Sequence, residues 1–273
     1  MILTLSIECA DKDPVDLSNE NGYREALAYN MVNHVMRFKP KNIVLGSGRM
    51  AMKVVDAFAN YFAKNKEQNI FHNVKFYSTS EKTTSYALRK GLTTESQVDE
   101  DTIIDVTVDG ADEVDENLCV LKGRGAAMFR EKFYASISKK VFLLIEKKKF
   151  VPSLGVGEIP IEISPFNYEV TIEKIVKLFF IKMYACKYRL MAYSSESYER
   201  YVTDNGNFIL LVNLDRPLTK KREEIIELDK QLHMITGVFE TGFFTDESYN
   251  ICYVDEPENN KLENNIIRIK SCI

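Results

Sequence analysis

Residues 103–132 read IIDVTVDGADEVDENLCVLKGRGAAMFREK, and this stretch decides the fold. It opens with a nearly unbroken apolar run, which is typical of a strand covered on both faces. A turn, a second strand and a Gly-rich bend follow, and the bend opens a helix predicted over 126–138. Three carboxylates and one ammonium lie close to these junctions: Asp109, Asp112, Glu131 and Lys122. Such a set suits proton transfer next to a carbonyl, a chemistry that does not require a metal.

Short strands alternate with amphipathic helices on both sides of this stretch. Hydrophobic periodicity predicts helices over 24–37, 50–65 and 83–91, and strands over 41–48, 73–79 and 140–146. Strands that alternate with helices imply right-handed βαβ units. The sequence therefore predicts an α/β fold built on a doubly wound, mostly parallel sheet.

The pattern changes after Lys149. A strand over 159–166, helices over 171–183 and 222–235, and a type I′ hairpin around Asn205-Gly206 indicate a smaller α+β domain. Strands over 237–254 are expected to return to the first sheet. We therefore predict the following division: an N-terminal extension at 1–21, an α/β domain at 22–155 and 236–256, the inserted domain at 156–235, and a peripheral tail at 257–273.

Composition excludes several classes of function. The 273 residues are 45% hydrophobic and 28% charged, with a formal net charge of -4, so neither nucleic acid nor an anionic membrane is an expected partner. Five scattered cysteines and three histidines argue against a structural zinc site and indicate reduced thiols in a cytoplasmic protein. The N-terminus lacks the features of a signal peptide, and no apolar run approaches the ~20 residues that span a bilayer.

Two loops outside the carboxyl ends of predicted strands are candidate ligand sites. Gly46-Ser47-Gly48 opens a helix, so its backbone N–H groups are suited to hold a phosphate, although a plain tight turn explains it equally well. Hydroxyl side chains gather at 78–84, where helix capping is the alternative.

The acidic run over 109–117 has three interpretations. It is a solvated loop, a metal site or a source of general acid and base groups. The spacing of a calcium loop is absent and no histidine is near, which weakens the metal interpretation. Lys122 and the helix that carries Glu131 favour acid–base chemistry, because an ammonium stabilises an anion such as an enediolate. The alternative for Glu131 is an exposed charge paired with a lysine.

Taken together, these segments resemble type A ribose-5-phosphate isomerases. The resemblance is carried by VDGADEV at 108–114 and LKGRGAAMFREK at 121–132, and VTDNGNFIL at 202–210 supports it. It covers roughly residues 22–254 in the family's order. The resemblance implies a doubly wound domain with an inserted lid at 156–235, a homodimer or homotetramer, no metal and no cofactor. It also implies a place in the non-oxidative pentose phosphate pathway.

The resemblance also implies a role for each site residue. Glu131 is expected to carry the proton between C1 and C2, Lys122 to stabilise the enediolate, and the pair Asp109 and Asp112 to handle ring opening and hydroxyl protons. The substrate-binding set is expected to be Ser47, Gly48, Arg49, Met50, Gly110, Ala111, Gly123, Arg124, Gly125 and Lys149.

One departure concerns the phosphate turn. The family's turn usually reads Gly-Thr-Gly-Ser-Thr, whereas this chain has Gly46-Ser47-Gly48-Arg49-Met50. Either Arg49 binds phosphate bidentately in place of the lost hydroxyls, or it points to solvent and phosphate binding is weakened. Arg24 is a further candidate anion contact.

The leading hypothesis is an isomerase that interconverts D-ribose 5-phosphate and D-ribulose 5-phosphate. Two alternatives stay open at this point: a non-catalytic phosphosugar-binding protein on the same fold, and an isomerase of a related phosphosugar. A pure binding protein has no need of Glu131, which favours an enzyme.

Overall fold

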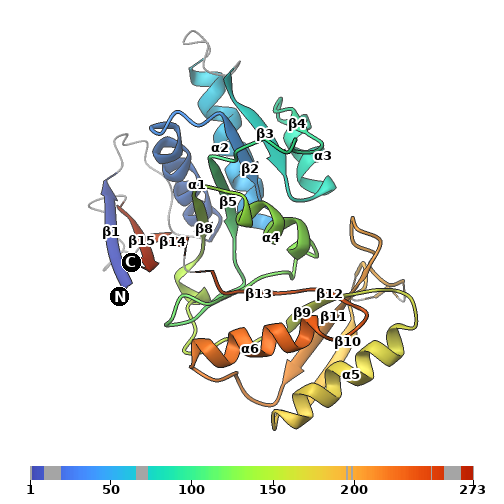
Figure 1. Cartoon of the computed structure of the whole chain (residues 1–273). Coiled ribbons are helices and arrows are strands. Elements are labelled where there is room, and N and C mark those ends of the chain that lie inside the picture. Colours follow the sequence, from blue (N-terminus) through green and yellow to red (C-terminus); the bar gives the residue numbers. More distant parts are fainter. Residues whose placement is uncertain are drawn as a thin grey trace. The chain divides into compact units, whose positions relative to one another are not determined.

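The computed structural model describes most of the chain as two compact units (Figure 1). The first unit comprises 1–110, 133–148 and 247–273, and the second unit comprises 111–132 and 149–246. The described residues are 2–8, 20–65, 73–194, 196–197, 199–246, 248–254 and 266–272.

The first unit is built on an eight-stranded sheet of order β1-β15-β14-β8-β5-β2-β3-β4. Six neighbouring strands are parallel: β14 (Tyr249–Val254), β8 (Val141–Leu144), β5 (Val106–Gly110), β2 (Asn42–Leu45), β3 (Lys75–Ser78) and β4 (Thr94–Glu95). Two antiparallel strands complete one edge: β15 (Ile266–Cys272) and β1 (Ile2–Glu8).

Helices cover both faces of this sheet. The first two, α1 (Glu20–Met36) and α2 (Gly48–Lys64), pack on the face that carries Ile43 and Leu45. The opposite face carries Val44, which packs with Tyr134 near the end of α4 (Met128–Ser136). The short α3 (Glu81–Arg89) connects β3 to β4. The predicted doubly wound, mostly parallel sheet is therefore confirmed.

The second unit is α+β. Its four-stranded antiparallel sheet has the order β10 (Cys186–Leu190), β11 (Phe208–Leu214), β9 (Ile159–Ile163) and β12 (Val238–Thr241). Two helices pack on it around buried Ile161, namely α5 (Tyr168–Ile181) and α6 (Arg222–His233). Three short strands form a separate antiparallel sheet: β6 (Glu113–Val114), β7 (Val120–Leu121) and β13 (Phe243–Phe244). A 3₁₀ turn over Lys147–Lys149 follows β8.

The observed division differs from the predicted one in its boundaries. The segment 111–132 belongs to the second unit, as does 236–246, because β12 and β13 pair there. Of the strands predicted over 237–254, only β14 joins the large sheet. Residues 2–8 and 266–272, expected in an extension and a tail, form the paired strands β1 and β15, and β15 also pairs with β14. Residues 9–19 and 255–265 lie outside the described part of the chain.

The hairpin at Asn205-Gly206 also differs in type. The Gly206 N–H donates to the Thr203 carbonyl at 2.9 Å, and of the turn residues only Gly206 has a positive φ, +79°. This is a type I turn closed by a left-handed glycine, a three-residue loop, because type I′ requires a positive φ at Asn205 as well.

Among the helices that the structure describes, none combines the length and apolar character needed to cross a bilayer.

Candidate active site

The first unit brings Asp109 to the predicted phosphate turn. β2 pairs in parallel with both β3 and β5, so the carboxyl ends of β2 and β5 adjoin where the strand order changes direction, the usual ligand site of such sheets. There the Asp109 Oδ1 atom accepts hydrogen bonds from the N–H groups of Ser47 (3.1 Å) and Gly110 (2.7 Å). A Cβ atom at position 46 would lie 1.9 Å from that oxygen, so Gly46 is required for this close approach.

The same turn leads into the N-terminus of α2, whose N–H groups attract anions. Ser47 precedes the helix in an extended conformation and its side chain makes no capping hydrogen bond. Gly48 has a φ of +80°, which favours glycine. Arg49 is exposed and forms no hydrogen bond or ion pair with any other residue that the structure describes. Met50 is buried in the core, so only its backbone is suited to a ligand contact.

The second unit brings Asp112 to Arg124 and Lys149. The Asp112 Oδ2 atom accepts a hydrogen bond from the Arg124 N–H at 3.1 Å, and the Lys149 Nζ atom lies 3.9 Å from Asp112 Oδ1. Asp112 also donates its own N–H to the Leu121 carbonyl at 2.8 Å. The carboxylate is therefore held by one backbone donor and one ammonium, and Ala111 directly precedes it.

Lys122 and Glu131 form a buried ion pair in the same unit. The Lys122 Nζ atom lies 3.2 Å from Glu131 Oε2, and the two side chains are only 5% and 4% exposed. Lys122 follows β7 and is anchored by its N–H, which donates to the Gly242 carbonyl at 2.9 Å. Glu131 lies in the first turn of α4. Because water is excluded, the charges of the pair act on a bound group more strongly than surface charges do.

The Gly-rich bend links Asp112 and its partners to the ion pair of Lys122 and Glu131. Gly123 has a φ of +107°, and a Cβ atom there would lie 2.8 Å from Met128 Cε. The Ala126 N–H donates to the Gly123 carbonyl at 2.9 Å, which closes the bend. Arg124 and Gly125 are exposed, so their backbone is open to a ligand from solvent.

Two further carboxylates of the acidic run, Glu113 and Asp115, have structural roles that sequence reasoning missed. Glu113 is buried and accepts hydrogen bonds from the N–H groups of Gly155 and Gly157, each at 2.7 Å, and from the Arg124 guanidinium at 2.8 Å. Asp115 is buried too and accepts from the Cys119 N–H at 2.8 Å. The only signal of this in the sequence was the alternation of acidic and apolar residues, because Glu113 and Asp115 flank a valine that is buried. Within the described ranges, no group of three or more His, Cys, Asp or Glu residues is arranged to hold a metal.

Arg24, predicted as an anion contact, forms an ion pair with Glu146, and the Lys148 Nζ atom lies 3.5 Å from the same carboxylate. The Arg24 guanidinium is therefore already paired with a buried carboxylate of the first unit.

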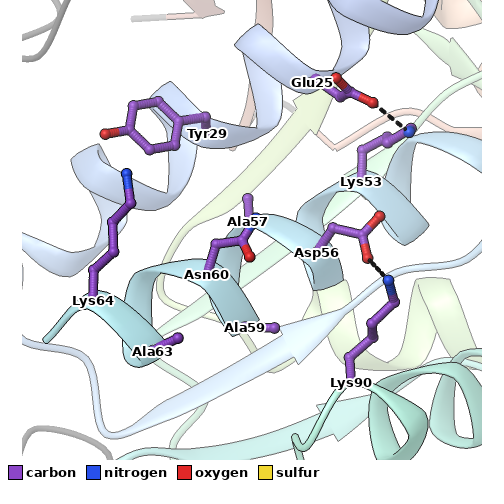
Figure 2. A pocket seen from close by; sticks show the side chains of 10 residues that line it. All are labelled: Glu25, Tyr29, Lys53, Asp56, Ala57, Ala59, Asn60, Ala63, Lys64 and Lys90. Carbon is purple, nitrogen blue, oxygen red and sulfur yellow. Dashed lines mark hydrogen bonds and ion pairs between the residues drawn. The ribbon is translucent and has the colours of Figure 1, made fainter. Parts of the chain in front are cut away.

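A cavity of about 650 Å³ lies elsewhere on the first unit (Figure 2). Four of its charged groups form two ion pairs: Lys53 Nζ lies 2.7 Å from Glu25, and Lys90 Nζ lies 2.8 Å from Asp56 (Figure 2). The hydrogen bond from Lys53 lowers the pKa of Glu25. None of its lining residues is a predicted site residue, so this cavity is separate from the candidate active site.

The model of the ribose 5-phosphate isomerase A (phosphoriboisomerase A) family matches residues 75–259. The chain belongs to this family. A probable ribose-5-phosphate isomerase 2 of Arabidopsis thaliana is 32% identical over 214 residues, which are 78% of this chain and 76% of the relative.

Solved structures of the family match over most of the chain. The ribose 5-phosphate isomerase from Plasmodium falciparum superposes with a TM-score of 0.74 at 29% identity, covering 85% of this chain and 93% of that one. A D-ribose-5-phosphate isomerase in complex with phospho-erythronic acid gives a TM-score of 0.71 at 26% identity, covering 86% and 94%. The family resemblance predicted from the motifs is therefore confirmed.

Proposed function

We propose that the protein interconverts D-ribose 5-phosphate and D-ribulose 5-phosphate through an enediolate. The observation that carries the proposal is the buried Lys122–Glu131 pair, in a chain whose relatives are named ribose-5-phosphate isomerases. A buried carboxylate beside an ammonium supplies the two functions that aldose–ketose isomerisation needs, which are a base and an anion-stabilising group.

In the proposed mechanism, Glu131 removes the proton from C2 of the open-chain aldose. The C–H electrons form the C1–C2 double bond, and the carbonyl π electrons move to O1, where Lys122 stabilises the negative charge. Glu131 then returns the proton to C1, the electrons of the O2–H bond form the C2 carbonyl, and the proton released from O2 is transferred to O1. Asp109 and Asp112 exchange the hydroxyl protons and assist ring opening.

Substrate binding is assigned to the two backbone-rich segments. The turn at Ser47, Gly48, Arg49 and Met50 and the ammonium of Lys149 hold phosphate and sugar oxygens. Gly110, Ala111, Gly123, Arg124 and Gly125 line the sugar with their backbone. The support is the N-terminus of α2 at the turn, and the placement of Lys149 beside Asp112.

The direct test is incubation of the purified protein with D-ribose 5-phosphate and measurement of ketose formation over time. Ketose formation supports the proposal. Tight binding without turnover would indicate a phosphosugar-binding protein instead, and preferred turnover of another aldose phosphate would indicate a related isomerase.

Activity is expected to survive exhaustive treatment with EDTA, because the stabilisation of the enediolate is assigned to Lys122. The measurement compares initial rates before and after chelation and after readdition of divalent ions. Loss of activity that a divalent ion restores would move the carboxylates of 109–116 to the role of metal ligands.

Replacement of Arg49 by alanine is expected to raise KM by about tenfold or more, with a smaller change in kcat. A charge-assisted contact with phosphate is worth roughly 1.5–3 kcal/mol, and the phosphate is remote from the reacting carbons. Arg49→Lys is expected to rescue only partly, because a point charge does not reproduce the guanidinium fork.

The matched control is Arg37→Ala, which removes another exposed arginine of the first unit. Steady-state kinetics at fixed ionic strength compare the three variants with the wild type. An unchanged KM in Arg49→Ala would show that Arg49 faces solvent in the complex and that the backbone donors hold the phosphate.

We also propose that the protein is a cytoplasmic homodimer or homotetramer. Support for association comes from large apolar side chains exposed on the second unit, including Phe166 at 79%, Phe180 at 74% and Met183 at 77%. Light scattering at several protein concentrations tests the oligomeric state.

A further inference from the structure

Glu131 is flanked in the sequence by two cationic residues, Arg130 and Lys132, and both of them bind other residues of the second unit. The start of α4 reads Arg130-Glu131-Lys132. Consecutive residues of a helix project about 100° apart, so Arg130 and Lys132 point to opposite flanks of Glu131. The partners of Arg130 lie on the hairpin at 203–207, and those of Lys132 lie on β12.

Arg130 is anchored to the hairpin at 203–207. Its Nη2 atom donates to the Asp204 carbonyl at 2.9 Å, and its Nε atom donates to Asn205 Oδ1 at 3.1 Å. The Nη1 atom lies 3.6 Å from Asp204 Oδ2. Because three nitrogens of the planar guanidinium contact one turn, the orientation of the Arg130 side chain is fixed. A single ammonium group does not fix orientation in this way.

The hairpin is itself fixed by a carboxylate from the sheet. Glu162 of β9 is fully buried, and its Oε1 atom accepts hydrogen bonds from Thr203 Oγ1 at 2.8 Å and from the Nδ2 atoms of Asn205 and Asn207, each at 3.1 Å. Asn205 therefore contacts both Glu162 and Arg130, and it connects the sheet to the helix.

Lys132 is anchored to β12 on the other flank. Its Nζ atom donates to Glu240 Oε1 at 2.5 Å and to the Thr241 carbonyl at 3.2 Å. The His233 Nε2 atom of α6 lies 2.9 Å from the same Glu240 oxygen. Asp229 and Glu240 raise the pKa of His233 to about 10, so His233 is a cation at neutral pH. Burial raises the pKa of Glu240, but His233 and Lys132 outweigh it and hold that pKa below its usual value.

We propose that Arg130 and Lys132 are positioning residues that together hold the Glu131 carboxylate at the reacting carbons, through the hairpin at 203–207 and through β12. The inference rests on the proposed role of Glu131. A helix of nine residues is marginal by itself, so tertiary anchors must fix its first turn. The ion pair with Lys122 fixes the distance of the carboxylate from one partner but not the orientation of the helix that carries it.

The test uses Arg130→Met and Lys132→Met in the full chain. Each is expected to lower kcat by about 10–100-fold, because a displacement of about 1 Å can cost that much. KM for D-ribose 5-phosphate is expected to change by less than about threefold, since neither side chain is assigned to substrate binding. Arg130→Lys is expected to restore part of the lost kcat.

Two control variants remove similar interactions away from α4. Arg216 binds the Asp215 carboxylate and the Met183 carbonyl, so Arg216→Met deletes a comparable arginine anchor of the second unit. Lys53→Met deletes a lysine–glutamate pair whose lysine side chain is 23% exposed, the same fraction as for Lys132. Both controls are expected to keep the wild-type kcat.

Energetic coupling between Arg130 and Asn205 tests whether Arg130 positions Glu131 through the hairpin. Asn205→Ala is expected to lower kcat in the same direction as Arg130→Met, and the double variant is expected to lose little more than the worse single variant. Independent, multiplicative losses would contradict an action through the hairpin.

The outcomes separate this inference from the proposed function. If the wild type does not isomerise D-ribose 5-phosphate, the proposed function fails. If the wild type is active, the kinetics of Arg130→Met and Lys132→Met decide the positioning role. That role is overturned if both variants keep the wild-type kcat, if they change only KM, or if they lose only thermal stability to the same extent as the controls.

Discussion

Replacement of Glu131 by glutamine is expected to lower kcat by about 10²–10⁴-fold, the usual effect of removing a general base. Glutamine has nearly the same shape as glutamate, and it keeps a carbonyl oxygen that can accept a hydrogen bond from Lys122. The fold of α4 and the affinity for substrate are therefore expected to persist, while the group that moves the proton between C2 and C1 is lost.

Two measurements check this expectation. Steady-state kinetics give kcat and KM, and hydrogen exchange between substrate and solvent reports the proton transfer itself, which the variant is expected to lose. Glu113→Gln is the control, because Glu113 is as buried as Glu131, at 4%, but its carboxylate binds loop N–H groups. Near wild-type turnover in Glu131→Gln would remove Glu131 from the role of base.

The sequence predicted the doubly wound sheet because its signals are local. Apolar strands such as 106–110 and amphipathic helices such as α2 bury the residues that their periodicity indicates. Strands β1 and β15 were missed because they pair with each other across the whole length of the chain, at Ile2 with Cys272, and nothing in either segment signals this pairing.

The candidate site residues were predicted from their positions near strand ends, but their environment was not. Glu131 had an alternative as an exposed surface charge, and the structure buries it against Lys122. That burial depends on the fold of the second unit, in which β7, the strand that leads to Lys122, pairs with β13 from a remote part of the chain. The same limit explains why Glu113 was read as part of one acidic loop and why the anchors of Arg130, 74 and 75 residues away, were not predicted.

The second substitution that is expected to cause a large loss of activity is at Lys122. Lys122→Ala is expected to lower kcat more than it raises KM, because the negative charge that the ammonium meets grows towards the transition state. The loss is expected to reach about 10²–10³-fold, as for removal of other groups that stabilise a developing oxyanion. A change confined to KM would mean that Lys122 binds only the ground-state substrate.

Stability measurements on variants of the Lys122–Glu131 pair separate catalysis from folding. Removing one partner of a buried ion pair is expected to cost about 3–5 kcal/mol of unfolding free energy, because the other charge stays buried. Lys122→Met combined with Glu131→Gln removes both charges, so the double variant is expected to be more stable than Lys122→Met alone, by chemical denaturation. Its kcat is nevertheless expected to stay as low as that of Glu131→Gln. Recovery of stability without recovery of turnover would show that the pair is kept for the reaction, and parallel recovery of both would show that the single variants were impaired by unfolding.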